Sequence, residues 1–338
     1  MNSRLFGVLF LSITAAACSF DDSASVPVPS NPQVAPSMKY RWEVNGHPTE
    51  VAVYSDGLTS HSSRMVLDAR SSRLYVLDEA AEQLKTVDVG TKRLIGEAAV
   101  GGKPVRLAVT ADGKRALVTR ADGTLRIIDT ANGHVLGDVT VGMSAYGVAV
   151  TGSGRYAYAA DPDDQGVALV DTGAGADPAD TLVAVADTVT HAIRFYDADG
   201  RSLSNTLVAV APSSIAFAPD RSKLVVGFNL GGAPGMAVLD FNTATTRIVP
   251  MDAPADSLPL EAAPAIECDG RYAYLVAGRA LYIIDTNAGA TFGTTRAVRL
   301  GSQALSVAVG PGGIAYVLTD DMTITVIGDG PGVSIVLR

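Results

Sequence analysis

Three aspartates lie close together at Asp161, Asp163 and Asp164, in the segment DPDDQG. Carboxylate oxygens at such short spacing are the hard ligands that Ca²⁺ prefers, so these residues are the metal candidates of the chain. Their spacing differs from that of an EF-hand, and acids in a solvated turn are the alternative interpretation. Asp320 and Asp321 fall in the corresponding loop near the C-terminal end and would make one rim of the molecule acidic.

Other chemistry finds little support in the residue pattern. The four histidines are scattered along the chain at His47, His61, His134 and His191. This scatter disfavours a zinc or copper site, and the haem motif C-x-x-C-H and the hydrolase motif G-x-S-x-G do not occur in the sequence. Cys268 lies between Glu267 and Asp269, and acidic neighbours raise the pKa of a thiol and disfavour a nucleophile. We therefore predict no catalytic residue and no cofactor, apart from the Ca²⁺ that the aspartates could bind.

A repeated element must position these residues. An apolar pair followed by aspartate recurs near the end of predicted strands at Asp88, Asp129, Asp171, Asp197, Asp240 and Asp285, with a degraded copy at Asp329. The intervals are 41, 42, 26, 43, 45 and 44 residues. A period of about 40 to 45 residues with four strands is that of a β-propeller blade. We interpret each aspartate as an acceptor for turn N–H groups rather than as part of a functional set.

The unit is clearest over residues 105–141. Four strands are predicted there, with the sequences VRLAVT, RALVTR, LRIIDT and HVLGDVTV, separated by the turns ADGK, ADGT and TANG. The second and third strands are apolar almost throughout, which is expected when neighbouring blades cover both faces of a sheet. The sequence therefore predicts an all-β chain that folds as one β-propeller.

Two irregularities qualify the blade count. The interval between Asp171 and Asp197 is only 26 residues, and residues 173–181 are too few for a fourth strand and the next first strand. We therefore expect seven blades or six, with one blade truncated or irregular. Residues 41–55 contain an additional strand before the first repeat. We expect it to join the C-terminal blade and close the ring, although the segment GVSIVL already offers that blade a fourth strand.

The repeat resembles the YVTN-type β-propeller repeat of bacterial and archaeal surface and periplasmic proteins. The family phrase V-G-x-x-P is matched by Val100 to Pro104, and the turn x-x-D-G-x is matched by Ala111 to Lys114. The Y-V-T-N strand itself is only partly kept, as LVTR ending at Arg120 and YVLD ending at Asp78. The resemblance covers about residues 60–338, is weakest around 172–212, and implies seven blades.

The first strand of each blade is expected to line the central channel. In register, the residues at its mouth are Met65, Arg106, Gly147, Ser214 and Ser306. With Tyr146 beside them, Arg106, Ser214 and Ser306 are the candidate ligand-face residues, together with Asp320 and Asp321 of the rim. The alternative interpretation is that these side chains fill the channel without a ligand.

Two functions follow from a propeller with such a channel. The first is a non-enzymatic binding scaffold for a protein, peptide or glycan partner. The second, implied by related propellers, is a lactonase-like or metal-assisted hydrolase that uses the central channel. Such a hydrolase needs several carboxylates, asparagines or histidines that converge on the channel, and the predicted channel positions lack them.

The N-terminus reads as a targeting segment. Residues 1–17 hold Arg4 and then an uncharged, mostly apolar run that is short for a membrane span. Small residues precede Cys18, so the segment resembles the signal of bacterial lipoproteins, which implies cleavage before Cys18 and acylation of that residue. Ala15 stands where the family prefers leucine, and an ordinary secretory signal is the alternative. By the family's sorting rule Ser19 implies anchoring to the outer membrane, facing the periplasm or the cell surface.

Residues 18–39 are rich in proline and serine and predict a disordered tether, which leaves residues 40–338 as a single propeller domain. The formal charge of −9 becomes −10 when the signal with Arg4 is removed. Such an acidic chain disfavours nucleic acid as a partner. We expect a monomer that contacts the membrane only through its lipid.

Overall fold

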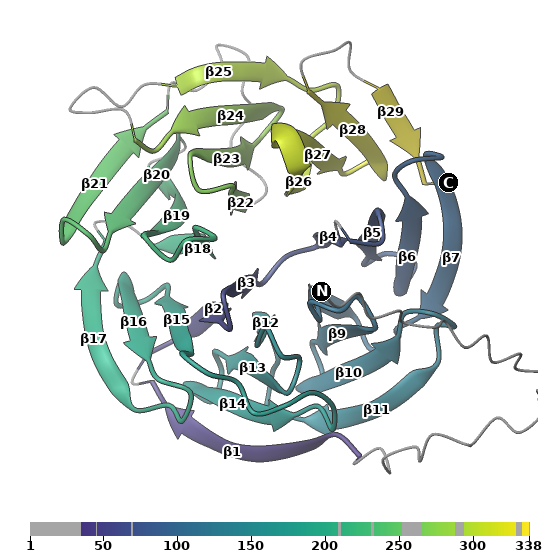
Figure 1. Ribbon diagram of the computed structural model, residues 1–338, viewed down its shortest axis with the longest axis vertical. Helices are drawn as coiled ribbons and strands as arrows, with labels where there is room; N and C mark the ends of the chain where they lie inside the picture. The colour runs from purple at the N-terminus through teal and green to yellow at the C-terminus, as the bar shows by residue number, and fades with distance from the viewer. Residues whose placement is uncertain are drawn as a thin grey trace, which may run out of the picture. The chain divides into compact units, whose positions relative to one another are not determined.

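The computed structural model describes residues 35–44, 46–68, 70–208, 211–230, 233–251, 265–287, 294–328 and 333–337. Within them the chain forms seven antiparallel sheets arranged around a centre (Figure 1). The prediction of an all-β, seven-bladed propeller is confirmed, and the six-bladed alternative is wrong. No helix in these ranges is long and apolar enough to cross a membrane.

Five blades are built from four consecutive strands each. The first two are β4 (Met65–Asp68), β5 (Arg73–Asp78), β6 (Gln83–Asp88) and β7 (Arg93–Ala99), then β8 (Pro104–Val109), β9 (Arg115–Arg120), β10 (Thr124–Asp129) and β11 (Val135–Thr140). The other three are β18 (Pro212–Phe217), β19 (Lys223–Leu230), β20 (Ala233–Asp240) and β21 (Thr245–Pro250); β22 (Ala265–Cys268), β23 (Tyr272–Ala277), β24 (Ala280–Asp285) and β25 (Thr294–Arg299); and β26 (Ala304–Gly310), β27 (Ile314–Thr319), β28 (Thr323–Ile327) and β29 (Val333–Val336). A short 3-10 turn, η1 (Pro311–Gly313), separates β26 from β27.

The two remaining blades combine strands that are distant in sequence. In one, β12 (Val148–Val150), β13 (Tyr156–Asp161) and β14 (Gly166–Asp171) are completed by the outer strand β1 (Ser37–Glu43). In the other, β15 (Leu182–Asp187), β16 (Ala192–Tyr196) and β17 (Ser202–Leu207) are completed on the inner side by β2 (Pro48–Ser55), which carries the hairpin partner β3 (Leu58–His61).

This arrangement corrects the expected ring closure. The strand predicted within residues 41–55 does not join the C-terminal blade, because that blade already owns four strands and β29 pairs with β28. Instead, β1 pairs with β14 and β2 pairs with β15. The interval between Asp171 and Asp197 lacks one outer and one inner strand, and the N-terminal segment supplies both. The predicted irregular blade is therefore irregular in chain order, and both blades at this point have their full set of strands.

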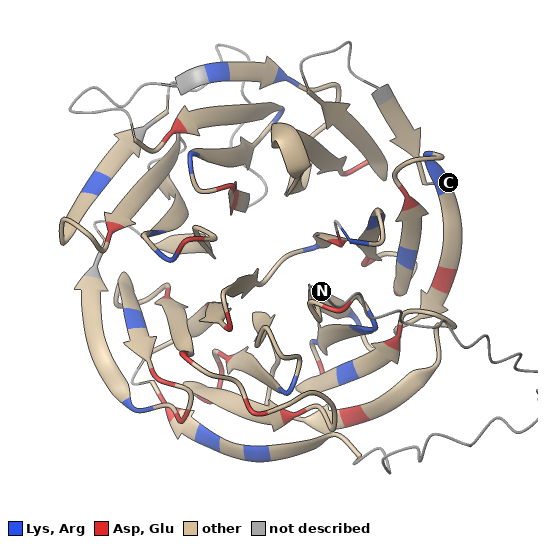
Figure 2. Cartoon of the chain, viewed as in Figure 1, with Lys and Arg blue, Asp and Glu red and all other residues tan. Residues whose placement is uncertain are grey.

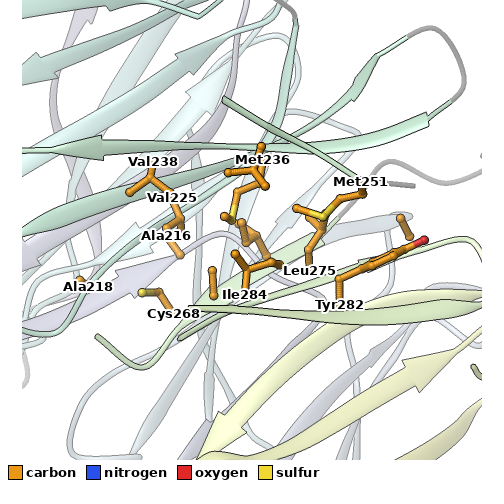
Figure 3. Close-up of a cluster of buried hydrophobic side chains, with 14 of the residues drawn as sticks. Ala216, Ala218, Val225, Met236, Val238, Met251, Cys268, Leu275, Tyr282 and Ile284 are labelled. Carbon is orange, nitrogen blue, oxygen red and sulfur yellow. The ribbon is translucent and has the colours of Figure 1, made fainter. Parts of the chain in front are cut away.

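Apolar side chains pack between neighbouring blades. In the cluster of Figure 3, Val225 and Met236 of one blade pack with Leu275 and Ile284 of the next, and all four side chains are buried. Burial on both faces explains the near-continuous apolar strands, and each such side chain contributes about 1.5 to 3 kcal/mol when it is removed from water. The blades depend on one another because a single sheet cannot cover its own faces.

The recurring aspartates close turns, as interpreted from the sequence. Asp240 Oδ1 accepts hydrogen bonds from the backbone N–H groups of Asn242 and Thr243, both at 3.0 Å. Asp129 Oδ1 accepts from the N–H of Ala131 at 2.8 Å in the same way. These carboxylates satisfy turn donors at the outer ends of the blades, away from the centre.

Candidate functional site

The segment from β2 through β3 to β4, here called the strap (residues 48–64), crosses the middle of the ring (Figure 1). Its end pairs with a neighbouring blade through an isolated bridge between Ser63 and Leu107 of β8. The centre of this propeller is therefore occupied by chain. The sequence did not predict this feature, because the extra N-terminal strand was expected at the C-terminal blade.

Where the innermost strands begin, the centre holds a buried ion pair. Arg106 of β8 donates from Nη2 and Nε to Glu50 Oε1 of the strap, at 2.9 and 3.2 Å. The two side chains are only 12% and 3% exposed. Burial raises the pKa of the Glu50 carboxyl, and the charge and hydrogen bonds of Arg106 oppose that increase. The guanidinium of Arg106 also lies 4.7 Å from the centre of the Tyr146 ring.

The other candidate ligand-face residues are also used inside the protein. The hydroxyl groups of Ser306 and the strap residue Ser63 lie 3.0 Å apart and are buried. Ser214 on β18 is 8% exposed, and Met65 is fully buried. The structure thus brings Arg106, Tyr146 and Ser306 to the centre, where Arg106 contacts Glu50 and Tyr146 and Ser306 contacts Ser63.

The other half of the centre, where the innermost strands end, holds a cavity of about 320 Å³. Side chains from six of the seven blades line it: Thr59, Ser60, His61, Met65, Val66, Leu67, Val109, Pro219, Glu267, Cys268, Asp269, Ala308, Val309 and Gly310. Thr59, Ser60 and His61 of the strap form part of its wall, so the cavity lies beside the strap in the middle of the ring. Its volume lies in the range of small-ligand sites.

The polar wall of the cavity is formed by β3 and the end of β22. His61 Nε2 lies 3.6 Å from Glu267 Oε2, and the two side chains are 14% and 21% exposed. Glu267 Oε1 accepts a hydrogen bond from the N–H of Cys268 at 3.0 Å. Asp269 accepts from the N–H of Tyr272 and, through its second oxygen, from the hydroxyl of Tyr274. The wall therefore combines an imidazole, two carboxylates and the hydroxyls of β3.

Sequence reasoning missed His61 and Glu267 as cavity residues. In the sequence Glu267 is notable only as a neighbour of Cys268, and the scatter of the histidines disfavours a shared site. The signal that unites them is the position of the strap, which brings β3 against β22. A local repeat pattern does not reveal that contact, because it joins residues about 200 positions apart in the sequence.

Cys268 is a packing residue. Its thiol is 4% exposed and belongs to the apolar cluster between two blades, near Ala218 (Figure 3). Burial, together with the charges of Glu267 and Asp269, raises the pKa of the thiol to about 12. A thiol with this pKa stays protonated at neutral pH, in agreement with the sequence argument against a nucleophile.

The aspartates proposed for Ca²⁺ are held by an arginine. Arg41 of β1 places Nη1 3.2 Å from Asp161 Oδ2 and 2.5 Å from Asp164 Oδ2. Asp161 is buried and also accepts hydrogen bonds from N–H groups, including those of Met143 and Asp163. Among the described residues no group of three or more His, Cys, Asp or Glu side chains is arranged to hold a metal ion. These carboxylates attach β1 to its blade and give the calcium hypothesis no support.

The rim acids of the last blade behave as turn residues. Asp320 accepts a hydrogen bond from the N–H of Gln303, and Asp321 accepts from the hydroxyls of Ser302 and Thr319. Figure 2 shows acidic and basic residues spread over all parts of the ring rather than gathered in one basic region. Cys18, the predicted lipidation site, lies outside the described residues, as does Asp329.

Comparisons with known proteins place the fold. No family model matches the chain, and no curated protein matches its sequence. Solved structures do match. Hydrazine synthase from Kuenenia stuttgartiensis is 17% identical, with a TM-score of 0.66 over 79% of this chain and 95% of that one. The Cps50 (Swd1) β-propeller domain of Myceliophteria thermophila is 13% identical, with a TM-score of 0.61 over 77% and 94%.

A functionally unknown protein from Desulfotomaculum acetoxidans is a third similar structure, 16% identical with a TM-score of 0.56 over 78% of this chain and 95% of that one. At identities this low, structural likeness carries no information about ligand or activity. The comparisons therefore establish this chain as similar to β-propellers of diverse proteins, and they establish its fold alone.

Proposed function

We propose that this chain is a non-enzymatic binding protein of the bacterial cell envelope, which receives a small group of a partner in its central cavity. The observation that carries the proposal is the cavity of about 320 Å³ at the meeting point of six blades. Toward the start of the innermost strands, the strap holds the buried pair of Glu50 and Arg106. A recess that is lined by residues of six blades, with the strap crossing the ring beside it, suits binding better than passage.

The residues that line the cavity suit a bound group that is apolar on one side and polar on the other. Val66, Leu67 and Val109 provide apolar surface, while Ser60 and His61 provide hydrogen-bonding groups. Protein side chains, peptides and glycans share this amphipathic character. The shallow rim of a propeller leaves room for the rest of such a partner outside the cavity.

A photo-crosslinking experiment tests this function. We expect a photoreactive amino acid at Thr59, in the cavity wall, to capture one defined partner when the full chain is produced in a bacterial envelope. The matched control places the same amino acid at Ile248, which is 46% exposed on an outer strand. Mass spectrometry identifies the captured species, and Thr59→Trp, which fills the cavity, is expected to prevent capture of that partner from a photoreactive group at Val309.

Equal capture from Thr59 and Ile248, or none from Thr59, would contradict binding in the cavity. The same material tests the lactonase-like alternative, which the imidazole and carboxylate of His61 and Glu267 in one cavity favour. Lactone or ester turnover that is lost in His61→Ala would support that hydrolase instead of a binding protein.

The envelope location depends on the N-terminal signal. We expect the full chain to be labelled by an alkyne analogue of palmitate in a bacterial host and to fractionate with membranes. Cys18→Ser should abolish labelling, because the serine hydroxyl does not replace the acylated thiol, and anchoring by acyl chains contributes about 0.8 kcal/mol per buried CH₂. Cys268→Ser is the matched control and should leave labelling unchanged. Labelling that persists in Cys18→Ser would show that the lipid is attached elsewhere.

A further inference from the structure

We infer that the group received by the central cavity is a cation on an aliphatic stem, such as the side chain of a partner's lysine or a free alkylamine. The inference rests on the proposed binding function and names the chemistry of its ligand. It depends on three observations: a carboxylate without a cationic partner, a second negative charge beside it, and apolar surface within reach of both.

The unmatched carboxylate is Glu267. Four buried carboxylates of the described chain have a cationic partner: Glu50 with Arg106 at 2.9 Å, Asp78 with Lys85 at 2.9 Å, Asp161 with Arg41 at 3.2 Å and Asp187 with Arg194 at 3.1 Å. A fifth, Asp68, instead accepts hydrogen bonds from the N–H of Arg70 and the hydroxyl of Ser71 in its own turn. In the described part of the chain, no lysine or arginine lies within 4.0 Å of the Glu267 carboxylate, whose only charged-group neighbour at that distance is His61. A partly buried carboxylate of this kind attracts a cation from outside.

Asp269 adds a second negative charge to the wall. Its donors are the N–H groups of Arg271 and Tyr272 and the hydroxyl of Tyr274, which are neutral and leave its charge in place. The guanidinium of Arg271 points to Asp285, with Nη2 3.1 Å from Oδ2. The ammonium of Lys223 donates to Thr286 Oγ1 at 3.4 Å and also to Asn287. The nearby cations are therefore engaged outside the cavity.

The apolar surface favours an organic cation over a metal ion. Val66, Leu67, Val109, Pro219 and Val309 line the cavity with the carboxylates, so methylene groups of a bound stem can pack against them. Ca²⁺ takes six to eight oxygen ligands, and the described residues offer no group of three acids or histidines arranged to hold a metal. The imidazole of His61, when neutral, can accept a further hydrogen bond from an ammonium or guanidinium group.

Calorimetric titration of the purified full chain in detergent tests the inference with defined probes. The peptide acetyl-Gly-Lys-Gly-amide is expected to bind. The same peptide with norleucine in place of lysine keeps the aliphatic stem and removes the charge, and it is expected to bind at least about tenfold more weakly. Glu267→Gln should weaken binding of the lysine peptide by at least about tenfold and leave binding of the norleucine peptide unchanged. The matched control is Glu97→Gln, an exposed carboxylate on the outer strand β7.

The source of the cation is distinguished by 1,5-diaminopentane. If the lysine peptide binds more tightly than the diamine, the cation comes from a partner's side chain. If the diamine binds more tightly, the cation is a free polyamine. Both outcomes support the inferred chemistry. Binding of CaCl₂ that depends on Glu267, or equal binding of the lysine and norleucine peptides, would overturn it. Thr59→Trp checks that binding occurs in the cavity, and circular dichroism confirms that each variant is folded.

The crosslinking experiment separates the two proposals. Suppose that the photoreactive amino acid at position 59 captures a partner equally well with Glu267 present and with Glu267→Gln, and that the lysine peptide does not bind. The binding function then stands, and the inference of a cationic ligand is wrong. If the photoreactive amino acid at position 59 captures nothing with Glu267 present, the proposed function itself fails, whatever the titration with the peptides and the diamine shows.

Discussion

Replacing Arg106 with alanine is expected to lower the free energy of unfolding by about 3 to 5 kcal/mol. The substitution leaves the Glu50 carboxylate, whose side chain is 3% exposed, without its cation in the middle of the ring. It also removes the contact with the Tyr146 ring. Urea unfolding of the full chain measures the effect, with circular dichroism for the sheets and the fluorescence of Trp42, the single tryptophan, for the strand β1.

The stability that Arg106→Ala loses should depend on pH in a defined direction. Burial already raises the pKa of the Glu50 carboxyl in the folded protein, and without Arg106 that pKa rises further. An acid whose folded pKa exceeds its unfolded value binds more protons when folded, so its stability contribution falls as pH rises. We therefore expect the difference between Arg106→Ala and wild type to be largest at neutral pH. It should shrink as pH falls through the raised pKa, because a protonated Glu50 needs no cation.

The double variant Glu50→Gln with Arg106→Met is the control. It removes both charges, so it should recover a large part of the stability lost in Arg106→Ala. A loss below about 1 kcal/mol in Arg106→Ala, or a double variant no more stable than that single one, would show that the pair does not stabilise the centre.

The blade repeat could be predicted because its signals are local. The turn aspartates, the glycine turns and the apolar strands lie within about 40 residues of one another. Strands 105–110 and 115–120 were therefore expected almost where β8 and β9 lie. The resemblance to YVTN-type repeats describes the same local features, and similar solved structures support the seven-bladed fold without selecting a family.

The candidate site could not be predicted in the same way. It depends on where the N-terminal strands are inserted, and strand pairing across the ring leaves no periodic signal in the sequence. The short interval after Asp171 was the available clue: it showed that two strands were missing, and residues 41–55 were the unassigned chain. The structure uses that chain for the two missing strands, since β1 pairs with β14 and β2 with β15, and β3, which pairs with β2, brings His61 to the centre.

Position 147 tests the insertion of the strap directly. Gly147 precedes β12, and a Cβ atom there would lie 2.6 Å from the carbonyl oxygen of Thr49 and 2.8 Å from the Cα atom of Glu50. Both atoms belong to the backbone of β2, which cannot move aside as a side chain can. Gly147→Ala is therefore expected to lower the free energy of unfolding by about 3 kcal/mol, measured by urea unfolding as above.

The matched control for this substitution is Gly301→Ala, because a Cβ atom at Gly301 would meet nothing within 4 Å. It should change stability by less than about 1 kcal/mol. If the clash displaces the strap, Gly147→Ala should also expose Trp42, since β1 and β2 belong to one N-terminal segment, and its fluorescence should shift before the sheets unfold. Equal effects of the two alanines would mean that β2 does not pass beside β12, and the cavity built on β3 would then lose the strand that positions His61.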